Sequence, residues 1–196
     1  MIFIIRHGQT ELNSRMLLQG RSDHPLNETG RQQASEAGRL LRREGIVFTR
    51  VYSSPLIRAV QTAELVAPGA EIITDERLLE MDYGPYEGTD LSHPPEEVLT
   101  FFRDFIHNPA PEGMEPLAHV VERAADFMKD LEGMEEDLLI STHAIAMKGI
   151  LEALTEESNG GYWNTYVGNC EVYCTEWKNG TFTVPKPMFP QGNKEK

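Results

Sequence analysis

Residues 2–8 read Ile-Phe-Ile-Ile-Arg-His-Gly, so four apolar residues are followed at once by an arginine, a histidine and a glycine. A short apolar run that ends abruptly in polar residues predicts a strand buried in a sheet, with a loop following at Arg6-His7-Gly8. A similar pattern occurs later, where the strand expected at 138–141 leads directly into Thr142-His143. Two of the six histidines therefore follow apolar strands in equivalent positions.

Segments with helical periodicity separate the expected strands, and Gly or Pro residues mark several of their ends. This alternation predicts an α/β protein, a three-layer α/β/α sandwich with a mainly parallel central sheet. Asn179-Gly180 adds a two-residue hairpin signal between two short strands. The expected strands cover residues 2–5, 46–52, 71–74, 138–141, 170–177 and 181–184, and the expected helices cover 29–44, 56–67, 96–106, 117–131 and 147–154.

The length of 196 residues fits a single domain, which we expect to span residues 1–196. Little periodicity follows residue 80, so we expect a loop and helical lid at about 81–116. The proline-rich, charged C-terminal end predicts a loosely held tail at about 185–196.

The sequence favours a cytoplasmic location. No apolar run approaches the roughly 18–20 residues that span a bilayer, and the first apolar run is too short for a signal peptide. Cys170 and Cys174 would lie roughly 13 Å apart along an extended strand. Disulfide Cα atoms must approach to within about 7 Å, so we expect no bridge between them.

The charge of the chain is strongly negative and unevenly distributed. Lys and Arg number 18 and Asp and Glu number 31, which gives a net charge of −13. This excess argues against nucleic acid and anionic membranes as partners. Residues 1–67 nevertheless carry a net charge of +3, and every basic residue there is Arg. An Arg-only stretch in an acidic protein indicates a local anion site.

Polar groups follow three of the expected strands. Arg6-His7-Gly8, Ser53-Ser54 and Thr142-His143 all stand where ligands bind in parallel sheets, outside the carboxyl ends of the strands. Arg58 lies one turn into the helix after the second of these strands. Two Arg and two His in one cleft predict a phosphate or sulfate pocket, because guanidinium groups match anion oxygens. The alternative is that these Arg side chains pair with surface carboxylates.

Other common catalytic patterns are absent from the sequence. It contains no HExxH, CxxC or EF-hand metal motif, no GxxxxGK[ST] nucleotide loop and no Gly-x-Ser-x-Gly elbow. We therefore expect no metal site.

The chain resembles the histidine phosphatase superfamily, whose members have the phosphoglycerate-mutase-like fold. Each fragment of the resemblance is weak alone, but their order and spacing together make a strong signal over nearly the whole chain. The matching segments are Arg6–Asn13, Gln19–Gly30, Gln33-Ala34, Ser53–Ala59, Thr62-Ala63, Leu79–Gly88 and Ser141–His143.

The resemblance implies a metal-independent, cofactor-free phosphomonoesterase that acts on small phosphorylated metabolites and releases inorganic phosphate. It implies that His7 is the nucleophile, forming a phosphohistidine, and that Glu80 protonates the leaving oxygen. The implied binders of the phosphoryl oxygens are Arg6, Arg58, His143 and Asn13. Thr10, Gln19 and Gly20 are expected to line the substrate side.

Two other functions stay open, a cofactor-dependent phosphoglycerate mutase and a catalytically silent scaffold on the same fold. Dedicated mutases of the family usually read Glu-Ser after His-Gly, whereas this chain reads Gln9-Thr10, which favours the phosphatase. The implied catalytic residues are all present, which argues against the silent scaffold. They are Arg6, His7, Arg58, Glu80 and His143. The physiological substrate and the oligomeric state are not predicted.

The chain departs from the family pattern at the expected rim of the pocket. Ala144 stands where the family usually has Gly, Lys148 where it usually has Arg, and Gly113–Pro116 where Gly-Glu-Ser is common. These departures leave the substrate open. Phe101, Phe102 and Phe105 are expected in the core, or in part as an apolar lid over the organic part of the substrate.

Overall fold

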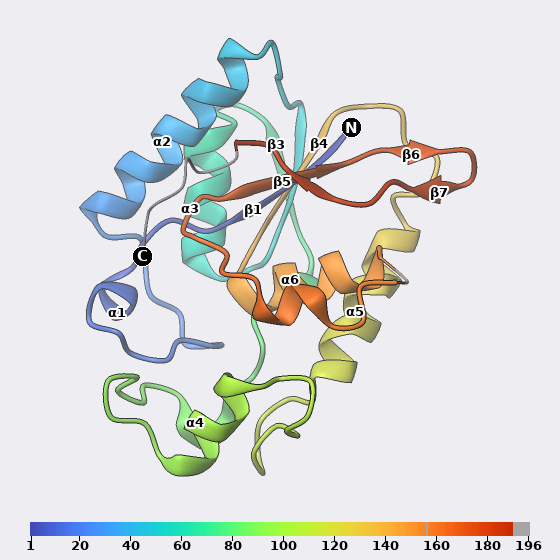
Figure 1. Cartoon of the computed structure of the whole chain (residues 1–196). Coiled ribbons are helices and arrows are strands. Elements are labelled where there is room, and N and C mark those ends of the chain that lie inside the picture. Colours follow the sequence, from blue (N-terminus) through green and yellow to red (C-terminus); the bar gives the residue numbers. More distant parts are fainter. Residues whose placement is uncertain (156, 190–196) are drawn as a thin grey trace.

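The computed structural model describes residues 1–155 and 157–189, and in them a six-stranded sheet lies between helices (Figure 1). Four neighbouring strands pair parallel, and the next strand at one edge, β5, pairs antiparallel with both of its neighbours, so the expected mainly parallel α/β sheet is confirmed. The strands, in their order across the sheet, are β3 (Glu71–Thr74), β2 (Arg50–Ser53), β4 (Leu138–Thr142), β1 (Ile2–Arg6), β5 (Val172–Thr175) and β8 (Lys186–Pro187).

Helices cover both faces of this sheet. The alternation of side chains along a strand sends Phe3 and Ile5 into one hydrophobic core and Ile2 and Ile4 into another. The first core lies under helices α2 (Glu28–Arg43) and α3 (Ile57–Val66), and the second lies under α5 (Leu117–Lys129) and α6 (Ala144–Ala153). Figure 1 shows these helix pairs on opposite sides of the sheet.

The remaining elements are short and lie mostly at the carboxyl edge of the sheet or beyond it. These elements are α1 (Glu11–Ser14), α4 (Glu96–Arg103), η1 (Glu76–Leu78), η2 (Gly84–Tyr86), η3 (Gly161–Asn164), β6 (Trp177–Lys178) and β7 (Thr181–Phe182).

None of the helices in residues 1–155 and 157–189 is both long and apolar enough to cross a membrane.

The hairpin expected at Asn179-Gly180 is confirmed. β6 and β7 pair antiparallel across these two residues. The φ angles of Asn179 and Gly180 are +54° and +82°, and a type I′ turn requires positive φ at both positions. The expected strand at 170–177 is interrupted at Glu176, and Cys170 and Cys174 are both free thiols.

Two predicted boundaries are wrong, each because of a local hydrogen bond. The strand expected at 46–52 begins only at Arg50, since the backbone N–H of Ile46 instead donates to the end of α2 at Leu41 (3.0 Å). The helix expected at 96–106 ends at Arg103. The side chain of Asp104 accepts from the backbone N–H groups of the residues two and three positions later, which favours a turn over a helix.

The C-terminal tail, expected to be loose from about residue 185, is paired where the structure describes it. β8 pairs with β5, and the backbone N–H of Met188 donates to the carbonyl of Val172 at 2.8 Å. The part of the expected tail at 190–196 lies outside the described residues.

The segment expected as a lid, 81–116, contains η2 and α4. Figure 1 shows α4 at the bottom of the view, away from the layered part of the fold. Its role as a lid stays a prediction.

Two glycines let the loop after β1 pack backbone against backbone on the start of α2. A Cβ at Gly30 would lie 2.1 Å from the carbonyl oxygen of Gln9, and one at Gly8 would lie 2.4 Å from that of Gly30. The Asn27 side chain closes the same contact, because it accepts from the N–H of Gly30 (2.8 Å) and donates to the side chain of Gln9 (3.0 Å). This packing fixes the loop that carries His7.

Gly30→Ala should therefore destabilise the protein. The new methyl group would force the loop and α2 apart, and we expect the free energy of unfolding to fall by about 1–3 kcal/mol in urea denaturation. Gly161→Ala is the matched control, because a Cβ there meets nothing within 4 Å. It should change stability by less than about 0.5 kcal/mol. Equal stability of the two variants would contradict this account of the packing.

Candidate active site

His7 stands at the carboxyl end of β1 with its tautomer fixed. Its Nδ1 lies 2.7 Å from the carbonyl oxygen of Gly8, and because a carbonyl only accepts, Nδ1 carries the proton. The lone pair is then on Nε2, the nitrogen free to attack. Burial, and then the charges of Arg58 and Arg6, hold the pKa of His7 well below its ordinary 6.5. The imidazole is therefore neutral at physiological pH.

His143 lies beside it, at the N-terminus of α6. The rings are 5.1 Å apart between centroids. Its Nε2 lies 2.8 Å from the hydroxyl of Ser54, which follows β2. Burial, followed by the charges of Arg58 and His7, lowers the pKa of His143 well below its ordinary value, so it too is neutral.

Arg58 on α3 is fully buried, and a loop holds it through backbone carbonyls. Its guanidinium donates to the carbonyls of Gly20 (2.5 Å) and Ser22 (2.8 Å). Burial is the main cause that lowers its pKa to about 10, so the group still carries its charge at neutral pH. Arg6 donates in a similar way to the carbonyl of Val167 (2.5 Å).

Several nitrogens of this cluster lack a hydrogen-bond partner. In the described part of the chain five buried side-chain polar atoms are unpartnered, and four belong to predicted site residues: Arg6 Nε, Arg58 Nε, His143 Nδ1 and Gln19 Nε2. An unsatisfied buried donor costs about 1–3 kcal/mol. Of the residues that carry these nitrogens, Arg6 and Gln19 line the cavity beside His7, whereas Arg58 and His143 are not among its described lining residues. Unpaired nitrogens around a neutral imidazole fit a bound oxyanion such as a phosphoryl group, which would accept from those that carry a proton.

Glu80 lies in the loop after η1 and is nearly fully buried. It lines a cavity together with His7. Its Oε1 accepts from the backbone N–H groups of Met81 (2.9 Å), Ile145 (3.1 Å) and Ala146 (3.0 Å). The last two donors belong to the first turn of α6, where the helix dipole favours a negative charge. The carboxylate is thus held by backbone groups on the helix that His143 precedes.

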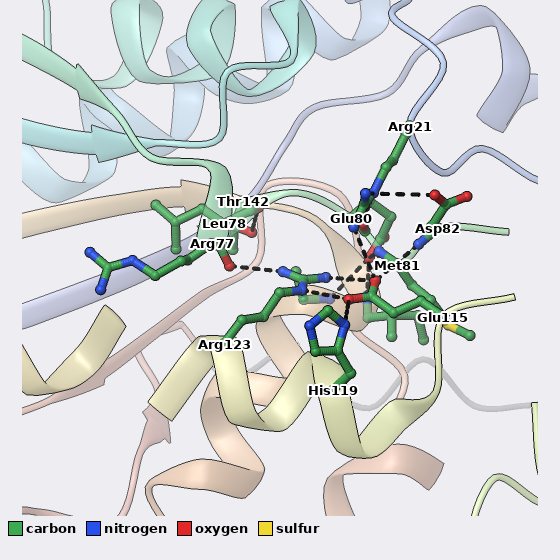
Figure 2. Close-up of polar contacts among 12 residues, drawn as sticks. Arg21, Arg77, Leu78, Glu80, Met81, Asp82, Glu115, His119, Arg123 and Thr142 are labelled. Carbon is green, nitrogen blue, oxygen red and sulfur yellow. Dashed lines mark hydrogen bonds and ion pairs between the residues drawn. The ribbon is translucent and has the colours of Figure 1, made fainter. Parts of the chain in front are cut away.

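A buried ion network holds the segment that carries Glu80 (Figure 2). Its centre is Glu115, whose carboxylate accepts from the guanidinium of Arg123 at 2.8 and 3.1 Å and from the backbone N–H of Asp82 at 3.1 Å. Arg21 bridges the network, since it lies 3.4 Å both from this carboxylate and from the carbonyl of Glu80. The network therefore ties the backbone on both sides of Met81 to α5.

Sequence reasoning missed this network. The one signal for the network was that Glu115 lies in the Gly113–Pro116 stretch, where the family commonly has Gly-Glu-Ser. Nothing in the neighbouring sequence pairs Glu115 with Arg21 or Arg123. His119 is exposed, and its Nδ1 lies 2.8 Å from the Glu115 carboxylate.

A cavity of about 310 Å³ opens beside His7 and Glu80. Of the four residues expected to bind the rest of the substrate or its phosphoryl group, Asn13 and Gln19 line it. Thr10 and Gly20 are not among the described lining residues. Thr10 instead donates from its hydroxyl to the side-chain oxygen of Gln19 (2.7 Å), and Gly20 accepts from the guanidinium of Arg58 through its carbonyl.

The side of the cavity away from the histidines is apolar. Phe102 and Phe105 line it and also pack against the hydrophobic cluster around α4, and their role as a lid over a substrate stays a prediction. Phe101, in contrast, is a core residue. Tyr166 stands at the mouth, 81% exposed.

No group of three or more His, Cys, Asp or Glu side chains suited to a metal ion occurs in residues 1–155 and 157–189.

Comparison with known proteins identifies the family. Residues 2–187 match the family model of the histidine phosphatase superfamily (branch 1). The chain belongs to this superfamily. Among histidine phosphatases and their relatives, a probable phosphoglycerate mutase, GpmB, of Escherichia coli O1:K1 / APEC is 34% identical over 154 residues, which cover 74% of this chain and 70% of that protein.

Solved structures of histidine phosphatases share the fold. The phosphoserine phosphatase of Entamoeba histolytica, in complex with 3-phosphoglyceric acid, superposes with a TM-score of 0.82 at 26% identity, over 97% of each chain. A mycobacterial glucosyl-3-phosphoglycerate phosphatase, in complex with VO3, has a TM-score of 0.78 at 25% identity, over 89% of this chain and 92% of that one.

Glu115→Gln should test the buried network of this histidine phosphatase. The substitution leaves the Arg123 guanidinium beside a neutral amide. We expect the free energy of unfolding at pH 7 to fall by about 2–3 kcal/mol, the range for hydrogen bonds to charged groups. Glu122→Gln, at an exposed position of α5, is the control and should change little.

The pH dependence of that difference has a definite sign. Burial opposes ionisation of Glu115, but the hydrogen bonds and charge of Arg123 outweigh it and hold the pKa below the ordinary 4.5. The stabilisation is therefore complete above pH 4.5 and is lost as the pH falls through the lower, folded-state pKa. Urea denaturation from pH 7 to pH 3 should show the two proteins converging in acid. A constant difference at every pH would argue against the ionic contribution.

Proposed function

We propose that the protein is a phosphomonoesterase that hydrolyses small phosphorylated metabolites through a phosphohistidine on His7. The observation that carries the proposal is a neutral, buried imidazole with its Nε2 lone pair free, beside four unpartnered nitrogens. A nucleophilic histidine has to be neutral, and a phosphoryl group in transfer has to be surrounded by donors. The His7 imidazole fits the first requirement, and the nitrogens of Arg6, Arg58, His143 and Gln19 fit the second. The proposed reaction uses these side chains and no metal ion.

In the first step the Nε2 atom of His7 attacks phosphorus, and the bond from phosphorus to the ester oxygen breaks. The leaving oxygen takes a proton from the carboxylic acid form of Glu80. Arg6 and Arg58 stabilise the charge on the three equatorial oxygens. His143 adds a donor at Nδ1 in the tautomer in which its Nε2 accepts from the hydroxyl of Ser54. Nδ1 of His7 keeps its proton and goes on donating it to the carbonyl of Gly8, and this hydrogen bond stabilises the imidazolium that forms.

In the second step a water molecule attacks the phosphohistidine. The Glu80 carboxylate takes a proton from this water, the bond from nitrogen to phosphorus breaks, and inorganic phosphate leaves. Glu80 thus returns to its protonated form for the next substrate. Because backbone groups of α6 hold its carboxylate, the same side chain can serve both steps from one position.

The relatives support the substrate class. Two of the structures that this chain resembles are named as phosphatases, and one of them holds 3-phosphoglyceric acid. The likeness to a probable phosphoglycerate mutase keeps mutase activity as the second candidate. A mutase returns the phosphoryl group to a bound phosphoglycerate, whereas a phosphatase passes it to water.

His7→Ala should abolish hydrolysis of p-nitrophenyl phosphate, with a loss in kcat/KM of more than about 10³-fold, because the nucleophile is gone. The control is His93→Ala, which removes an exposed histidine of the same chain. Thermal unfolding of both variants verifies that they fold. Activity of His7→Ala within tenfold of the wild type would sink the assignment.

The same preparation distinguishes the two candidate functions. Wild-type protein should release phosphate from 3-phosphoglycerate or other phosphometabolites faster than it interconverts 2- and 3-phosphoglycerate in the presence of 2,3-bisphosphoglycerate. Isomerisation that outpaces phosphate release would make the protein a mutase.

Glu80→Gln should slow the hydrolysis of poor leaving groups more than that of good ones. An alkyl phosphate needs a proton on its departing oxygen, whereas p-nitrophenolate departs without one. We expect the formation of the phosphoenzyme from an alkyl phosphate to slow by about 10²–10⁴-fold, and from p-nitrophenyl phosphate much less, in single-turnover measurements. Equal slowing for both substrates would argue against Glu80 as the acid.

A further inference from the structure

Lys148 on α6 is a buried ammonium in the wall of the catalytic cavity. Its side chain is only 9% exposed and lines the same cavity as His7 and Glu80. Its Nζ donates to the carbonyl of Trp163 at 2.8 Å and stands 5.4 Å from the ring centre of Phe105. These two contacts, from η3 and from the segment after α4, fix the ammonium on the apolar side of the cavity.

The charge of Lys148 has no ion-pair partner in the described part of the chain. No carboxylate oxygen of residues 1–155 and 157–189 lies within 4.0 Å of Nζ. An ammonium carries three donors, and only the one to Trp163 has a protein acceptor in these residues. A buried cation without a counter-ion is costly, so this position is favourable when a ligand supplies the negative charge.

The ammonium is separate from the group of donors expected to hold a phosphoryl group. Those donors come from β1, α3 and the start of α6, whereas Lys148 is bonded to Trp163 and packed on Phe105. A substrate whose phosphorus lies at His7 would therefore meet Lys148 with its organic part. The cavity of about 310 Å³ has room for a small organic group beside the phosphoryl group.

We propose that Lys148 determines specificity by binding a carboxylate on the organic part of the substrate. This inference rests on the proposed phosphatase function. A carboxylate matches the site because one point charge with two remaining donors can neutralise a single negative charge. A second phosphate, with nearly two charges, would need further donors, such as an Arg fork or a helix N-terminus.

The protonation of Lys148 makes the preference depend on pH. Burial is the main cause that lowers its pKa to about 8, the charge of Glu80 opposes this shift, and the charge of Arg6 adds to it. His7, Tyr83 and Tyr166 complete the titratable groups of the cavity. The ammonium is charged below pH 8 and neutral above it, so the advantage of a carboxylate should be lost as the pH rises through 8.

The test compares two substrates that differ in one group. 3-Phosphoglycerate and glycerol 3-phosphate share the phosphate and the carbon chain, but the first ends in a carboxylate and the second in a hydroxymethyl group. We expect wild-type protein at pH 7 to have the higher kcat/KM for 3-phosphoglycerate. Lys148→Met should reduce the ratio of the two values about tenfold or more, mainly through the KM for 3-phosphoglycerate.

Lys148→Arg is the matched variant, because it keeps the charge. It should retain the preference, and above pH 8, where the wild type loses it, the arginine variant should not. If either compound is turned over too slowly, its inhibition constant against p-nitrophenyl phosphate hydrolysis gives the same ratio. A ratio unchanged in Lys148→Met, or one that does not depend on pH in the wild type, would overturn the inference.

The outcome separates this inference from the proposed function. Loss of carboxylate preference with His7-dependent hydrolysis of p-nitrophenyl phosphate intact bears on Lys148 alone. Hydrolysis that survives His7→Ala would remove the proposed function itself.

Discussion

Parallel pairing of β1 with β4, with Arg6 opposite Thr142, is the constraint on which the site depends. It makes the two strands end side by side, so the next residue of each, His7 and His143, meets the other at one point. Pairing of β4 with β2 then adds Ser54, whose hydroxyl contacts His143. The backbone ladder of the sheet thus determines the distance between the two imidazoles, and no side-chain adjustment is needed to bring them together.

Burial gives these groups their protonation states. The histidines are neutral because burial, and then the charges of Arg58 and Arg6, lower the pKa of each well below its ordinary value. Arg6 and Lys148 line the cavity with Glu80 as the one carboxylate among the described lining residues, so the cations are in excess and the site as a whole favours an anion. It does so inside a protein of net charge −13. Since charges in solution are screened over about 8–10 Å, recognition is expected to be short-range and confined to the cavity.

Features that depend on local pattern could be predicted from the sequence. The apolar runs before His7 and His143, and the helical spacing that includes Arg58, indicated both the parallel sheet and the residues at its edge. These predictions worked because a strand, its end and the polar residue that follows are adjacent in the chain. The family resemblance supplied Glu80, which no periodicity identifies.

Features that depend on distant partners could not be predicted. Nothing near Glu115 reveals that Arg123 and Arg21 share its carboxylate, because that pairing exists only after α5 has packed beside the loop. The end of α4 was missed for a smaller reason, since the side chain of Asp104 competes for backbone donors that a helix would use. The pairing of β8 likewise required knowledge of which sheet edge is open.

The N-terminal half of α6 joins three parts of the site in one rigid body. His143 caps it, the N–H groups of Ile145 and Ala146 hold Glu80, and Lys148 follows one turn later. A helix rises about 1.5 Å per residue, so the backbone positions of His143 and Lys148 are about 7.5 Å apart along its axis. Movement of the 81–116 segment would leave this spacing unchanged. In the proposed complex this helix therefore fixes the distance between the phosphoryl group and the carboxylate of a substrate, and loop motion does not alter that distance.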